Sequence, residues 1–195
     1  MSIAKRGRSL AVLGFLAAGG IGLLSATQVW LIAARHDAAE PIEVTGSAAL
    51  PLLTPLSLAV LALAAVLAIV GPVLRYVLAA LGGVIAVLLG AATFELLLHR
   101  PLSAVAATVT ETTGIAGTAG VSGIVDAIDI TPWPVVALVG WILLLAVAVF
   151  ALCTARGWRS GGRRFRTDVQ GHAGDGPVDA IDSWDELSRG TDPTR

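Results

Sequence analysis

The chain has 195 residues, of which 55% are hydrophobic and only 14% are charged, and its formal net charge is −1. Soluble globular domains carry about 25% charged residues, so this composition, with a mean hydropathy of +0.81, excludes an ordinary soluble domain. Because Cys153 is the single cysteine, an intrachain disulfide and a cysteine-based metal site are also excluded.

Four long apolar stretches make up most of the chain. They are residues 10–33, 52–74, 76–98 and 135–152. Each is about as long as a helix that crosses a hydrocarbon core of roughly 30 Å. We therefore predict an all-α membrane protein with a four-helix transmembrane domain over residues 10–155 and small extracytoplasmic loops. A basic cytoplasmic N-terminus, residues 1–9, precedes it, and a disordered cytoplasmic C-terminal tail, residues 156–195, follows it.

The first apolar stretch has some features of a secretory signal. Basic residues precede it, and it contains Leu24-Ser25-Ala26, which a signal peptidase could accept. The apolar run continues through Val29-Trp30-Leu31-Ile32, beyond the length of a signal's apolar core. We therefore expect a retained helix that reaches Ala33, with Trp30 as an anchor at the outer membrane interface.

The second and third stretches are predicted to form a tight antiparallel hairpin. Pro72 is placed in the last turn of the second stretch, and Arg75 in the turn that follows. The stripes of small residues Gly14-Ala18-Gly22 and Ala79-Gly83 suggest close helix contacts, because helices in lipid associate through small residues. Whether those contacts lie within one bundle or between copies is left open.

Basic residues predict the orientation, since they are enriched on the cytoplasmic side of a membrane. They precede the first stretch, occupy the turn between the second and third, and follow the fourth: Lys5, Arg6, Arg8, Arg75, Arg156, Arg159, Arg163, Arg164 and Arg166. The two outer loops carry only Arg35 and Arg100. An even number of spans in the plasma membrane, with both termini cytoplasmic, fits this pattern.

The outer loops are predicted to form a small cap. Residues 42–46 alternate like a short strand that ends in a glycine turn. Pro101 is followed by an apolar helical face that favours a short interfacial helix. Residues 114–123 have a glycine at every third position, which favours a flexible stretch, and residues 126–130 alternate like a strand that could pair with the first loop.

Glu95 is the only ionisable residue well within a span, which makes it a candidate ligand-binding or proton-carrying group. His99 lies four residues later and on the same helical face. The alternative is a paired carboxylate at the membrane interface. No metal site or cofactor is predicted. Signatures of a P-loop, a dinucleotide-binding loop, a zinc protease and a serine hydrolase are missing, so we predict no catalytic residue and no enzymatic activity.

The tail combines a basic and an acidic part. Its juxtamembrane arginines are predicted to bind anionic lipid headgroups, rather than nucleic acid: Arg156, Arg159, Arg163, Arg164 and Arg166. Ser183 and Glu186 then form a helix-capping pattern. The short helix that follows would present candidate docking residues for a protein partner: Trp184, Asp185, Leu187 and Arg189. A passive solvated tail is the alternative.

Several segments resemble the actinobacterial tryptophan-associated transmembrane protein family, named for genes among those of tryptophan biosynthesis. They are Val44-Thr45-Gly46, Thr131-Pro132-Trp133-Pro134, Gly157-Trp158, Arg163-Arg164-Phe165 and the ending from Ser183 to Thr194. Phe165 stands where members tend to carry tyrosine. The resemblance implies a membrane protein linked to tryptophan metabolism, and it transfers no catalytic residue.

Together these observations favour a non-enzymatic inner-membrane accessory protein whose cytoplasmic tail docks a partner. The alternative is a small transporter, or transporter subunit, for tryptophan, indole or a related metabolite, with Glu95 in the path. The sequence does not determine the oligomeric state.

Overall fold

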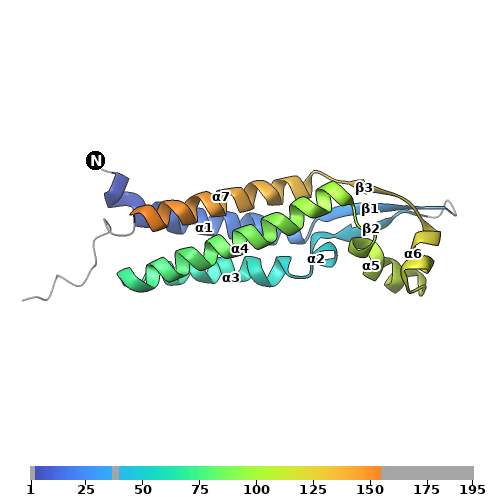
Figure 1. Ribbon diagram of the computed structural model, residues 1–195, viewed down its shortest axis with the longest axis horizontal. Helices are drawn as coiled ribbons and strands as arrows, with labels where there is room; N and C mark the ends of the chain where they lie inside the picture. Colours follow the sequence, from blue (N-terminus) through green and yellow to red (C-terminus); the bar gives the residue numbers. More distant parts are fainter. Residues whose placement is uncertain (1–2, 37–39, 155–195) are drawn as a thin grey trace, which may run out of the picture. The chain divides into compact units, whose positions relative to one another are not determined.

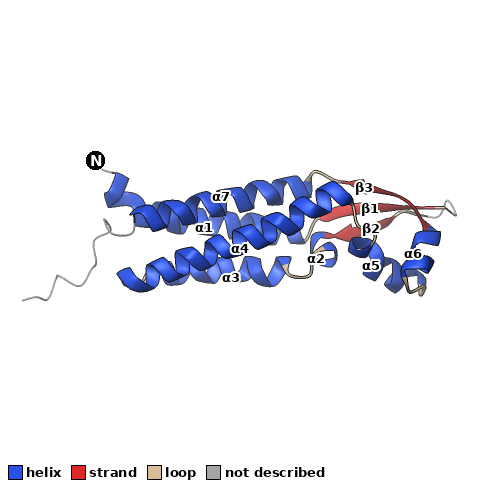
Figure 2. Cartoon of the chain, viewed as in Figure 1, coloured by secondary structure: helices blue, strands red, loops and turns tan. Residues whose placement is uncertain are grey.

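The computed structural model of the protein describes residues 3–36 and 40–154. This part of the chain is mostly helical, with seven helices and three strands (Figures 1 and 2). In chain order they are α1 (Ile3–Ala26), β1 (Val29–Arg35), β2 (Ile42–Thr45), α2 (Gly46–Ala49), α3 (Leu53–Leu67), α4 (Pro72–His99), α5 (Ser103–Thr113), α6 (Thr118–Ile124), β3 (Val125–Ile130) and α7 (Trp133–Thr154).

Helices α1, α3, α4 and α7 form a bundle. α1 packs against both α3 and α7, and α4 packs against α7, whereas α3 and α4 contact each other less. Large side chains fill the centre, including Phe15, Leu89 and Trp141. Ile69 and Val73, by contrast, are 87% and 79% exposed on the outside. Such extensive apolar exposure is expected of a surface that faces lipid rather than water.

Three helices in the described residues are long and apolar enough to cross a membrane: α1 over Gly7–Ala26, α4 over Val73–His99, and α7. α3 is apolar but has only 15 residues. Its length is about 22 Å at 1.5 Å per residue, shorter than a hydrocarbon core of about 30 Å. The structure therefore supports three spanning helices and one shorter helix beside them.

The predicted boundary between the second and third spans was wrong. α3 ends at Leu67, and Pro72 opens α4 instead of closing α3. Proline is tolerated in a first helical turn because the N–H groups there lack helical partners anyway. Arg75 consequently lies in the first turn of α4, where it is buried and its Nη2 donates to the Val70 carbonyl at 3.3 Å.

The predicted end of the first span was also wrong. α1 ends at Ala26, and the apolar residues after it form strand β1, which pairs with β2 and β3. A short apolar run can be a buried strand or a continuing helix, and hydrophobicity alone does not separate the two. The fold is therefore not all-α. α1 nevertheless belongs to the bundle, to whose core it contributes Phe15 and Ala18.

The three strands form an antiparallel sheet in the order β2-β1-β3. It begins where α1 ends and leads into α7, so it lies at that end of the bundle (Figure 1). The expected strands at residues 42–45 and 126–130 are confirmed, but β3 pairs with β1 rather than with the first loop. The expected helix after Pro101 is α5, which contacts β2. The glycine-rich stretch predicted as flexible contains α6.

Candidate functional site

Glycines bring the bundle helices into close contact. A Cβ atom added to Gly14 of α1 would lie 2.5 Å from Val147 of α7. One added to Gly22 would meet the Trp141 ring of α7 and the Ser57 hydroxyl of α3. The stripe that begins at Gly14 therefore packs within the bundle, where small residues let helices approach closely.

Glycines of α4 likewise allow close contact with the neighbouring helices. A Cβ atom on Gly82 would meet the Phe15 ring of α1, while one on Gly90 would lie 3.7 Å from the Trp141 Cβ. Trp141 is 1% exposed. Aromatic rings thus occupy the space that Gly22 and Gly82 leave. An open apolar groove of about 440 Å³ remains between α4 and α7, beside Gly90 and Trp141.

Two buried hydroxyls in the bundle helices are satisfied locally. Ser57 Oγ donates to the Leu53 carbonyl at 2.6 Å, and Thr93 Oγ1 donates to the Leu89 carbonyl at 2.7 Å. Both bonds close within a single helix, one turn back, as serine and threonine hydroxyls often do. In the described residues these hydroxyls therefore do not form a polar chain across the bundle.

A buried tryptophan joins the bundle to the sheet. Trp30 of β1 is fully buried, and its indole Nε1 donates to the Ser25 carbonyl at 2.9 Å and to Ser25 Oγ at 3.0 Å. Ser25 Oγ in turn donates to the Trp133 carbonyl at 3.2 Å. Trp30 was predicted to be an interface anchor. That prediction was wrong, because the ring is enclosed by protein and its N–H has protein acceptors.

Two further segments complete this junction. The Gly46 N–H donates to the Gln28 carbonyl at 2.9 Å, and a Cβ atom on Gly46 would lie 2.7 Å from Trp30 Nε1. Thr131 Oγ1 donates to the Val29 carbonyl at 2.6 Å, and the Thr131 N–H to the Trp30 carbonyl at 3.0 Å. The ends of α1, β2 and β3 therefore pack and hydrogen-bond around the Trp30 indole ring.

Glu95 and His99 lie in the last two turns of α4, and both side chains are exposed. Glu95 lines a cavity of about 250 Å³ together with residues of α2 and the start of α5, including Ala49 and Ser103. The structure therefore places Glu95 at the sheet end of the bundle rather than at its centre. Among the described residues, no ion pair joins Glu95 to His99, and no three His, Cys, Asp or Glu side chains form a group able to hold a metal ion.

The predicted docking and headgroup-binding residues lie outside the described residues. These are Trp184, Asp185, Leu187 and Arg189 for docking, and Arg156, Arg159, Arg163, Arg164 and Arg166 for lipid.

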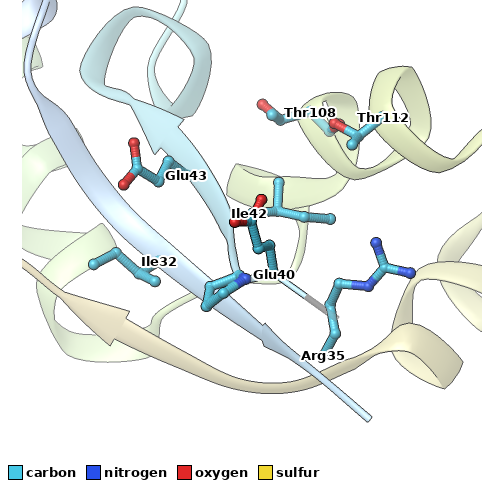
Figure 3. A pocket seen from close by; sticks show the side chains of 8 residues that line it. Ile32, Arg35, Glu40, Ile42, Glu43, Thr108 and Thr112 are labelled. Carbon is cyan, nitrogen blue, oxygen red and sulfur yellow. The ribbon is translucent and has the colours of Figure 1, made fainter. Parts of the chain in front are cut away.

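A larger cleft of about 870 Å³ lies at the outer edge of the sheet, beside β2 and α5. It was not predicted from the sequence. Its lining residues come from three elements and from the residues just before β2: Ile32, Arg35, Glu40, Pro41, Ile42, Glu43, Thr108 and Thr112. Figure 3 shows Glu43 on one side of β2 and the two threonines on the other. The sequence signal was weak, because Thr108 and Thr112 lie at helical spacing beside the buried Val105 and Val109 and look like the polar border of that face.

The model of the tryptophan-associated transmembrane protein family matches residues 12–194. The chain belongs to this family. No curated protein and no solved structure shows a match to the chain. Two segments that resembled the family in the sequence, Val44-Thr45-Gly46 and Thr131-Pro132-Trp133-Pro134, meet at the Trp30 junction. In this member of the family, these segments therefore join the sheet to the bundle.

Proposed function

We propose that the protein is a non-enzymatic membrane accessory protein, linked to tryptophan metabolism, that binds a partner protein through its C-terminal segment. The observation that carries this proposal is the close packing of the bundle helices around Trp141. Trp141 closes its middle against Gly22 and Gly90, and the hydroxyls of Ser57 and Thr93 bond to their own helices. A closely packed interior suits a protein that holds partner proteins at the membrane better than it suits a protein that transports a solute.

The proposed arrangement has α3 as a fourth span in the plasma membrane and both termini in the cytoplasm. Its support is the distribution of charge. Two arginines, Arg35 and Arg100, lie at the sheet end, where they are outnumbered by acidic residues in the sheet, just before β2 and in α5: Glu40, Glu43, Glu111, Asp126 and Asp129. Arg8 and Arg75 lie near the starts of α1 and α4, away from the sheet. Basic residues favour the cytoplasmic side, and local bilayer thinning accommodates a helix as short as α3.

Partner binding is tested on the full chain in native membranes. Cells carrying the wild-type chain, Trp184→Ala or Trp184→Phe are treated with a crosslinker, and the proteins that copurify are quantified. The proposal predicts one partner that is recovered with the wild type, lost with Trp184→Ala and largely kept with Trp184→Phe, because aromatic anchors dominate many interfaces. Equal recovery with all three chains would exclude docking through Trp184.

A further inference from the structure

We propose that the cleft beside β2 binds an extended, basic peptide segment of another protein, which adds to the sheet as a fourth strand. Strand β2 is an edge of the sheet, since the order is β2-β1-β3. An edge strand presents unpaired backbone N–H and C=O groups, which an extended peptide can satisfy.

The cleft has the shape that such an added strand requires. It is lined from both faces of the sheet at the β2 edge: Ile32 and Glu43 belong to one cross-strand row, while Thr108 and Thr112 come from α5. Successive side chains of a strand point to opposite faces. A peptide beside β2 would thus place alternate side chains next to Glu43 and next to the two threonines.

Charge defines the chemistry of the segment. Glu40 and Glu43 both line the cleft and both are exposed, whereas Arg35 is its single basic lining residue. Opposite charges facing each other on neighbouring strands stabilise the pair, and like charges destabilise it. A lysine or arginine opposite Glu43 is therefore favoured, with a small apolar residue on the α5 side.

The same charges argue against a second copy of the chain as the occupant. In a dimer paired through β2, Glu40 and Glu43 of each copy would approach the acidic residues of the other.

The test measures peptide binding to the full chain in lipid nanodiscs by fluorescence anisotropy. Three labelled probes are compared: an alternating Lys-Val hexapeptide, the corresponding Glu-Val hexapeptide, and the Lys-Val peptide N-methylated at alternate residues. Saturable binding of the first alone is expected, because methylation removes the backbone donors that pair with a strand. Equal binding of the acidic or the methylated peptide would overturn the proposal.

Two matched pairs of variants locate the binding. Glu43 and Asp129 flank Ile32 in the same cross-strand row, but only Glu43 lines the cleft. Glu43→Lys should weaken binding of the Lys-Val peptide about fivefold or more, and Asp129→Lys much less. Thr108→Trp should block the cleft, whereas Ala107→Trp, at the neighbouring exposed position, should not. Equal effects within either pair would contradict a site at β2.

Discussion

The indole nitrogen of Trp30 lies 2.9 Å from the carbonyl oxygen of Ser25, across the turn between α1 and β1. This contact lies where the chain leaves the bundle for the sheet. It is a second bond to this carbonyl in the last turn of α1, which also accepts from the Gln28 N–H at 3.1 Å. The bond therefore ties the Trp30 ring to the end of α1 at the point where β1 begins.

Replacing Trp30 with Phe should destabilise the fold more than replacing Trp141 with Phe. Both rings are buried, but the Trp141 Nε1 has no hydrogen-bond partner among the described residues. The two substitutions remove the same atoms, so the difference reports the Trp30 hydrogen bond, about 0.5–1.5 kcal/mol, because the Ser25 carbonyl still accepts from the Gln28 N–H. Denaturation of the purified protein in detergent micelles measures it. Equal loss in both variants would show that the bond to Ser25 contributes nothing.

Gly22→Ala should loosen the bundle, and Gly20→Ala should not. A Cβ atom at position 22 would meet Trp141 and Ser57, whereas one at position 20 has nothing within 4 Å. Overpacking a filled core costs about 1–3 kcal/mol, while an unobstructed Gly→Ala change within a helix is stabilising by up to about 1 kcal/mol. The same denaturation assay compares them. A Gly22→Ala variant as stable as Gly20→Ala would show that α1 and α7 do not pack as described.

Much of the bundle could be predicted from the length of the apolar stretches, because α4 and α7 are each a continuous apolar segment long enough to span a bilayer. The junction could not. Val29–Ile32 is as apolar as a span, and its assignment to β1 depends on pairing with residues 42–45 and with residues 125–130, of which the second segment lies far away in the sequence. The role of Pro72 was equally ambiguous, because a proline can follow the end of one helix or begin the next.

Arg100 should tolerate glycine better than alanine. It ends α4 with φ 45°, in the left-handed region, and its Nη1 donates to the Ile128 carbonyl at 3.4 Å. Both substitutions remove that long, exposed bond, but only glycine removes the conformational penalty, which is about 1 kcal/mol or more. A Gly variant more stable than the Ala variant in the denaturation assay is expected. The reverse order would contradict the left-handed end of α4.

Cysteine labelling should place the sheet outside the cell and the end of α7 inside. Cys153 is exposed in the last turn of α7, and Ala107 is exposed on α5. A membrane-impermeant maleimide added to intact cells should label Ala107→Cys in a Cys153→Ser background. It should leave Cys153 unlabelled until the membrane is opened. Labelling of Cys153 in intact cells would reverse the proposed orientation.

The candidate site was less predictable than the fold. Glu95 stood out in the sequence because it interrupts an apolar run, yet the structure places it exposed beside α2 and α5. The cleft gave no such signal, because Glu43 and Thr108 are ordinary polar positions in an alternating strand and an amphipathic helix. Only pairing of β1 with β2 and docking of α5 bring them together.

The central claim is that the bundle is a packed support rather than a path for a solute. Tryptophan flux into vesicles measures this most directly. The full chain and its Glu95→Gln variant are reconstituted in proteoliposomes, and accumulation of labelled tryptophan is compared with that in protein-free vesicles. The account predicts the same low rate in all three preparations. Saturable uptake that requires the wild-type chain and is lost with Glu95→Gln would contradict it.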